Sequence, residues 1–303
     1  MLCRKPHSRL GSVGARWQPP PVDDGWPFRG AEAVEAGALS ARQLRKFYTA
    51  VYPGVYAPRA VELSPIQRAR AGWLWSRRQG IVAGLSASAM LGSKWVEPTV
   101  PAELVHVNRR APAMLTVHSD SLLPGEAIEL DGMLVTTAAR TAFDVGRRLP
   151  LTASVQRLDA LMNATNLKVV DIEDVIAVHP GVRGLPTLRR TLALVDGGAE
   201  SPYESLTRLT LVRAGLPAPE TQIRVADEFG FAMAYLDMGW RDRRVGVEFD
   251  GAQHWTDARQ RRRDIERLSD LESLGWRIIR VSSDMLRTPA VIIARVRAAL
   301  GSG

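Results

Sequence analysis

Three acidic residues in the last quarter of the chain have the types and the spacing of a metal site. Asp237 closes one apolar, β-prone segment, and Glu248 and Asp250 lie two residues apart in the next one, VGVEFD. Residues two apart in a strand project from the same face, so we expect Glu248 and Asp250 to point the same way. If the two segments form neighbouring strands, the three carboxylates converge. Such oxygen ligands suit Mg²⁺ or Mn²⁺, which can activate water for attack on a phosphodiester bond.

The apolar surroundings of these acids favour the metal interpretation. Glu248 and Asp250 alternate with Val, Gly and Phe, and two buried carboxylates repel each other unless a cation or a proton relieves the repulsion. The alternative is that the strand turns both acids to solvent on a wet face. We predict that Asp237, Glu248 and Asp250 bind the ion.

The flanking pattern predicts that residues 203–303 form one domain with the element order α, β, β, β, α, β, α. Ser201 and Pro202 mark the start of the first helix, and the Gly-containing segment 197–202 is predicted to be a linker. Alternating strands follow in TQIRVAD, FAMAYLD and RVGVEFD. A charged helix, the strand WRIIRVS and a last helix complete the order.

These residues resemble the motifs of the very-short-patch-repair-like branch of the PD-(D/E)XK nuclease superfamily. The resemblance covers about residues 200–300 and rests on Glu204, Asp237, the run Glu248-Phe249-Asp250-Gly251, and His254. It implies a restriction-endonuclease-like fold and metal-dependent hydrolysis of DNA. It also implies that Asp237 and Glu248 are ligands, that Asp250 holds the third motif position, and that His254 lies near the scissile phosphate.

One departure from this superfamily concerns its usual lysine. Residues 201–303 contain no lysine, and Asp250 stands in its place. Another group must then orient the water or offset charge, and the candidates are Gln253, His254 and Arg261.

Several of these residues also have ordinary structural explanations. Glu204, three residues after Ser201, fits a capping box as well as an active site. His254 could be a structural histidine or a general acid or base. Arg261 and Arg262 begin a helix, where a phosphate backbone would offset their unfavourable position, although nearby acids could neutralise them instead.

Residues 26–60 have the element order of a winged helix-turn-helix: helix, turn, basic helix, hairpin. Arg42, Arg45 and Lys46 lie on the basic helix, which would enter a major groove; the alternative is a solvated face on a small helical pair. The runs Leu39-Ser40-Ala41-Arg42-Gln43-Leu44 and Pro-Gly-Val-Tyr at 53–56 resemble the N-terminal domain of AbiEi-type antitoxins. That resemblance implies DNA-binding autoregulation and a cognate toxin as a possible partner.

The remaining features bound the class of protein. A length of 303 residues predicts about two or more domains, with 1–25 as a flexible leader and 61–196 as a mixed α/β middle domain. The net charge of +8 favours nucleic acid as a partner. Cys3 is the only cysteine, which excludes intramolecular disulfides and cysteine-cluster metal sites. We find no apolar run that could span a bilayer and no signal peptide, and expect a cytoplasmic protein without a membrane partner.

The sequence therefore predicts an α/β protein of the α+β multidomain type that binds DNA. We expect the C-terminal domain to be a Mg²⁺- or Mn²⁺-dependent deoxyribonuclease. The alternative is a non-catalytic transcriptional regulator or antitoxin-like protein that carries a degenerate nuclease fold. The oligomeric state stays open.

Overall fold

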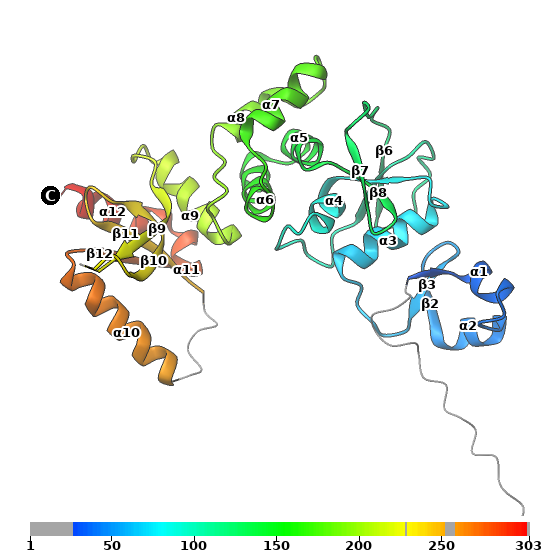
Figure 1. The fold of residues 1–303 in the computed structure, drawn as a ribbon, viewed down its shortest axis with the longest axis horizontal. Coiled ribbons are helices and arrows are strands. Elements are labelled where there is room, and N and C mark those ends of the chain that lie inside the picture. Colours follow the sequence, from blue (N-terminus) through cyan, green and yellow to red (C-terminus); the bar gives the residue numbers. More distant parts are fainter. Residues whose placement is uncertain (1–26, 228, 252–257, 302–303) are drawn as a thin grey trace, which may run out of the picture.

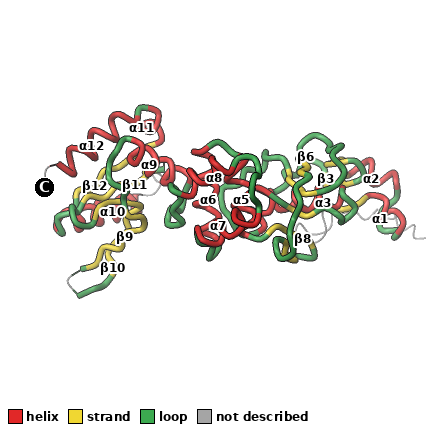
Figure 2. Tube along the Cα trace, turned by 90° about the horizontal axis from the view of Figure 1, so that it is seen from above, coloured by secondary structure: helices red, strands yellow, loops and turns green. Residues whose placement is uncertain are grey.

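The computed structural model describes residues 27–227, 229–251 and 258–301. Its helices and three separate sheets follow one another along a long axis, with the N-terminal unit at one end and the C-terminal domain at the other (Figures 1 and 2). The predicted α+β multidomain class is confirmed. The expected leader, residues 1–25, lies outside the described residues.

The N-terminal unit contains two short helices and a three-stranded sheet. Its elements are β1 (Phe28–Arg29), α1 (Gly30–Glu35), α2 (Ala41–Phe47), β2 (Tyr48–Tyr52) and β3 (Val55–Pro58), and the strand order is β1-β3-β2. A reciprocal capping box starts α2, because Ser40 Oγ accepts from the Gln43 N–H and the Gln43 side chain accepts from the Ser40 N–H. The helix, helix, hairpin order is present, and its assignment as a winged helix-turn-helix stays a prediction.

The middle of the chain combines a five-stranded sheet with a group of helices. The sheet part contains α3 (Pro65–Trp75), β4 (Ile81–Val82), α4 (Gly84–Met90), β5 (Ala102–Val105), β6 (Leu115–His118), β7 (Ala127–Leu130) and β8 (Met133–Thr136), in the strand order β6-β5-β4-β8-β7. The helical part contains α5 (Ala138–Arg148), α6 (Leu151–Ala164), α7 (Val169–Val178) and α8 (Leu185–Leu192).

A buried ionic cluster ties these two parts together. Arg140 on α5 is 1% exposed and donates to Glu126 at 2.6 Å and to Asp144 at 2.9 Å. His179, directly after α7, contacts the other oxygen of Glu126 at 2.6 Å. Because an unpaired buried charge is costly, this network holds the sheet loops and the helices in one arrangement.

A second buried ion pair joins the middle of the chain to the C-terminal domain. Asp159 on α6 accepts from Arg208 and from Ser205, both on α9 (Pro202–Arg213), at 2.7 Å each. The segment predicted as a linker is itself held by hydrogen bonds, since Asp196 accepts from the Gly198 N–H and from the Thr221 hydroxyl at 2.9 Å each.

The C-terminal domain contains a four-stranded sheet in the order β12-β11-β10-β9. After α9 come β9 (Glu220–Ala226), β10 (Ala232–Trp240), β11 (Val245–Asp250), α10 (Ala258–Ser273), β12 (Arg277–Ser282), α11 (Ser283–Arg287) and α12 (Pro289–Gly301). β10 is antiparallel to both β9 and β11, and β11 is parallel to β12 through the α10 crossover. The order matches the predicted one, with the short α11 added.

Helices cover the two faces of this sheet. Val245 and Val247 of β11 pack with residues of α9 and α12 on one face, and Leu236 of β10 packs with Leu271 of α10 on the other. The prediction that Asp237 closes its strand is wrong, because β10 continues through Trp240. Asp237 therefore lies inside the sheet.

Among the described residues, no helix is long and apolar enough to cross a membrane.

Removal of the Arg208 guanidinium should loosen the connection between α6 and α9. Arg208→Met leaves Asp159 buried without its cation, so we expect the free energy of unfolding at pH 7 to fall by about 3 kcal/mol. Urea denaturation measures this change. Arg213→Met is the matched control, because Arg213 is exposed on the same helix and its replacement should cost under about 0.5 kcal/mol. Equal losses in the two variants would contradict the assignment.

Candidate active site

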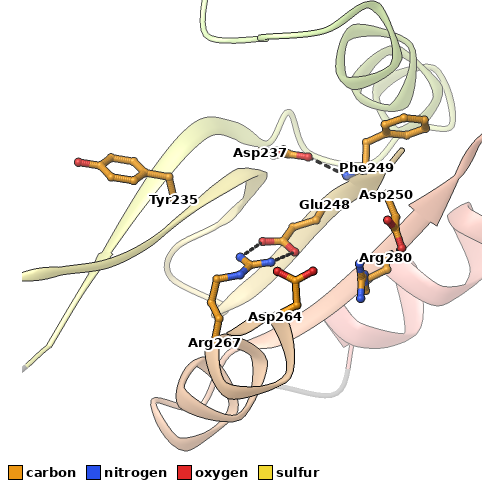
Figure 3. A pocket seen from close by; sticks show the side chains of 8 residues that line it. All are labelled: Tyr235, Asp237, Glu248, Phe249, Asp250, Asp264, Arg267 and Arg280. Carbon is orange, nitrogen blue, oxygen red and sulfur yellow. Dashed lines mark hydrogen bonds and ion pairs between the residues drawn. The ribbon is translucent and has the colours of Figure 1, made fainter. Parts of the chain in front are cut away.

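A cavity of about 230 Å³ lies between the sheet and α10 of the C-terminal domain. Its lining includes all three acids singled out in the sequence, and Figure 3 shows how they lie. The lining residues are Tyr235 and Asp237 of β10, Glu248, Phe249 and Asp250 of β11, Asp264 and Arg267 of α10, and Arg280 of β12. Four carboxylates and two guanidinium groups therefore share one small space.

Asp237 is the group whose protonation the fold changes most. Its Oδ2 accepts the Phe249 N–H at 2.7 Å, a hydrogen bond between β10 and β11 (Figure 3). Burial raises the pKa of Asp237 to about 7, the negative charges of Glu204 and Glu248 add to the rise, and the Phe249 N–H opposes it. At neutral pH this carboxyl group is thus close to half protonated.

Glu248 is held by an arginine that sequence reasoning did not single out. Glu248 is 7% exposed, and Arg267 donates to both of its oxygens, at 2.6 and 2.8 Å. This bidentate contact fixes the orientation of the carboxylate plane and places a positive charge beside it. The hydrogen bonds with Glu248 raise the pKa of Arg267, so the guanidinium stays charged.

Asp250 is turned towards a second arginine. Arg280 of β12 approaches Asp250 Oδ2 at 2.8 Å, and its Cα pairs in register with Glu248 of the parallel neighbour β11. Glu248 and Asp250 therefore line one cavity, as their spacing predicted, but each has its own cationic partner.

Glu204 lies beside the cavity rather than in its lining. It is 8% exposed on α9, and it adds to the rise in the Asp237 pKa. Ser201 Oγ caps α9 by accepting the Glu204 N–H at 3.2 Å, while the Glu204 side chain accepts from the Glu200 N–H at 2.8 Å. The Glu204 side chain thus accepts from the residue before the helix cap, whereas in a reciprocal capping box it would accept from the cap residue itself. Burial raises the pKa of Glu204.

None of the other predicted residues is among the described residues that line this cavity. Gln253 and His254 lie outside the described residues, as does the side chain of Arg261. Arg262 is exposed on α10 and contacts Glu266 at 3.1 Å. The predicted DNA-binding residues of α2, namely Arg42, Arg45 and Lys46, are exposed at the far end of the molecule from the cavity (Figure 1).

Two signals could have identified the arginines in advance. Asp264, Arg267 and Leu271 are spaced three and four apart, so they share the face of α10 that packs on the sheet. Arg280 lies three residues after Arg277 in the six-residue strand β12. The direction of the Arg280 side chain follows from the parallel register of β12 with β11.

The oxygen donors of this cavity fit a divalent cation. Asp237 and Glu248 lie on adjacent antiparallel strands, and the charge of Glu248 raises the pKa of Asp237, so a cation between them would relieve that repulsion. Within the described residues, no group of three His, Cys, Asp or Glu side chains is arranged to hold a metal ion. Two carboxylates with added water or phosphate oxygens would suit Mg²⁺, which keeps several waters.

Comparisons with known proteins place this geometry in a family. A family model, REase_MTES_1575, which describes restriction-endonuclease-like domains, matches residues 218–300. Two sequences of Mycobacterium tuberculosis, named Uncharacterized protein Rv2248 (strain H37Rv) and Uncharacterized protein MT2308 (strain CDC 1551), are each 32% identical over 218 residues. Each match covers 71% of this chain and 79% of the relative.

The chain belongs to the same family as these two mycobacterial proteins. Its C-terminal part is a restriction-endonuclease-like domain, which confirms the fold that the nuclease resemblance implied. The very-short-patch-repair-like branch and the AbiEi-type N-terminus stay predictions. No solved structure matches this chain.

Asp237 makes the stability of the restriction-endonuclease-like domain depend on pH. Its pKa is raised in the folded state, so its contribution to stability is complete below about pH 4 and is lost as the pH rises towards about 7. Asp237→Asn keeps an acceptor for the Phe249 N–H and removes the titration. We expect this variant to be more stable than the wild type at pH 8, by roughly 4 kcal/mol at most, and no more stable at pH 4.

Urea denaturation in EDTA at pH 4, 6 and 8 measures this difference. A gain that is the same at all three pH values would show that Asp237 is not the titrating group.

Proposed function

We propose that residues 203–303 hydrolyse DNA phosphodiester bonds with Mg²⁺ or Mn²⁺. The observation that carries the proposal is the convergence of Asp237 and Glu248 in one cavity of a restriction-endonuclease-like domain, where burial, with a smaller contribution from the charge of Glu248, raises the pKa of Asp237. The balance of four carboxylates against two guanidinium groups would repel a phosphate, and a bound divalent cation removes that obstacle.

Six of the described residues that line the cavity would have a part in this reaction. Asp237 and Glu248 would hold the ion. When bound, the ion would polarise the phosphodiester and make a water molecule more acidic. The Phe249 N–H fixes one oxygen of Asp237, and among the described residues nothing donates to its other oxygen. Arg267 orients Glu248, and it must share at least one Glu248 oxygen when the ion binds.

Arg280 and Asp250 occupy the region where the superfamily resemblance places its lysine. The Arg280 guanidinium can offset negative charge that develops on a phosphate oxygen, while Asp250 holds that guanidinium in position at 2.8 Å. His254 stays a proposal for the proton steps, and Gln253 stays a proposal for orienting the water.

Cleavage assays test the proposed hydrolysis directly. With Mg²⁺ or Mn²⁺ we expect cleavage of at least one DNA among duplex, single-stranded, mismatched and branched substrates. Asp237→Asn and Glu248→Gln should each lower the rate by about 100-fold or more, because several kcal/mol of transition-state stabilisation depend on the ion. Glu220→Gln is the matched control, since Glu220 is an exposed carboxylate on β9 of the same sheet. Unchanged cleavage in the two cavity variants would contradict the proposal.

A second candidate function is favoured by one specific observation. Arg267 occupies both oxygens of Glu248, and residues 201–303 contain no lysine, as expected for a site that has lost catalysis. In that case we propose a DNA-binding regulator that acts through α2 in the cytoplasm, with a cognate toxin as a possible partner on the strength of the AbiEi resemblance.

Arg42→Ala and Arg45→Ala separate the two functions. If α2 contacts the phosphate backbone, each variant should weaken DNA binding and reduce the slope of log affinity against log salt by about 1. Asp237→Asn should leave this binding unchanged. Fluorescence anisotropy in EDTA at several salt concentrations provides the measurement, and an unaltered slope would remove α2 from the DNA interface.

A further inference from the structure

The β9–β10 hairpin projects from the restriction-endonuclease-like domain and carries exposed apolar side chains (Figure 2). Phe231 is 72% exposed, Met233 38% and Tyr235 59%, whereas Ala234 and Leu236 are buried. Phe231 directly precedes β10, and the pairing of β10 with β9 shifts its register between Ala232 and Ala234. We name the three exposed side chains the β10 stripe. No described part of the chain covers the β10 stripe.

The hairpin tip holds the β10 stripe in a defined position. Asp227 Oδ1 accepts the N–H groups of Phe229 at 3.0 Å and of Phe231 at 2.8 Å, and Arg224 donates to the Gly230 carbonyl. Phe229 at the tip is 76% exposed. A turn fixed by hydrogen bonds that presents aromatic rings to solvent is typical of a contact surface.

The β10 stripe leads into the carboxylate cavity. Tyr235 lines that cavity and precedes Asp237 by two residues on the same strand (Figure 3). Met233 lines a second cavity of about 310 Å³ together with Arg263, Glu266, Arg267 and Asp270 of α10. Arg267 lines both cavities and so lies between them, and we call the two cavities together the groove.

Arginines border the stripe on both sides. Arg224 on β9 is exposed and pairs in register with Tyr235, and Arg263 is exposed on α10 across the groove. Cations beside apolar and aromatic side chains complement a nucleic-acid strand, whose phosphates meet the cations while its bases stack on the rings.

We propose that the β10 stripe stacks against unpaired bases and guides single-stranded DNA into the carboxylate cavity. The guiding step rests on the proposed function, and it makes single-stranded DNA the substrate class of that function. An intact duplex offers no base faces along its length, so the stripe selects unpaired strands.

The test compares the binding of two DNAs by the full-length protein. Fluorescence anisotropy in EDTA measures affinity for labelled 20-nucleotide oligothymidine and for a 20-base-pair duplex. The double variant Phe231→Ala, Tyr235→Ala should weaken binding of the single strand by about tenfold or more and leave duplex binding unchanged. The double variant Phe231→Tyr, Tyr235→Phe keeps both rings and should bind the single strand as the wild type does.

Val291→Ala is the matched control. Val291 is an exposed apolar residue of α12, and its replacement should change neither affinity. Three results would overturn the proposal: unchanged single-strand binding in the alanine double variant, an equal loss for the duplex, or a wild-type dimer that the same variant converts to a monomer. The last result would identify the stripe as a self-association surface.

Failure of this proposal can be told apart from failure of the nuclease function. Binding in EDTA does not require cleavage. Selective loss of single-strand binding in a protein that cleaves no DNA supports the stacking site and refutes hydrolysis. Metal-dependent cleavage that the alanine double variant retains, together with unchanged single-strand binding, supports hydrolysis and refutes the stacking site.

Discussion

The burial of Asp237 beside Glu248 is the constraint on which the C-terminal domain depends. Two carboxylates on adjacent strands of a largely apolar sheet cannot both stay ionised without compensation. The fold meets this cost in two ways, since Arg267 neutralises Glu248 while Asp237 retains a proton up to about pH 7. The buried Glu204 adds a further negative charge close by. A site with this balance is prepared to exchange a proton for a metal cation.

Both compensating arginines come from the unit β11–α10–β12. Parallel pairing of β11 with β12 requires a crossover, and α10 is that crossover. The helix brings Arg267 over the sheet, and the parallel register brings Arg280 beside Glu248 and within reach of Asp250. The topology that makes the sheet thus also supplies the positive charge that its acids need.

Local patterns predicted the order of the C-terminal elements, because caps, turns and two-residue alternation can each be recognised within a short segment of sequence. The same alternation predicted that Glu248 and Asp250 line one cavity. The end of β10 was misplaced, because the strand continues through Gly239 to Trp240. In the structure a Cβ at this position would lie 2.2 Å from the Val245 carbonyl oxygen, so glycine is required for the close approach of β10 and β11. The two-residue strands β1 and β4 are too short for any periodic signal.

Two-residue alternation could not identify the partners of the acids, because these partners lie on other elements. Residues 201–303 contain sixteen arginines, and only register and helix rotation decide which of them reach the cavity. Arg267 and Arg280 do so, whereas Arg262 contacts an acid on its own helix. Arg261 and Arg262, the arginines expected to act, precede Arg267 on the same helix.

The absence of lysine from residues 201–303 limits what the cavity can do with protons. An arginine does not lose its proton in a protein, so Arg267 and Arg280 can orient groups and offset charge but cannot act as acids or bases. Among the described residues of the cavity, Asp237 is the one whose pKa is moved to near neutrality. A cation that binds there must displace the Asp237 proton, so metal affinity rises with pH through the same range in which Asp237 ionises. The group that makes the folded domain less stable at high pH is therefore also the group that makes it ready for a metal.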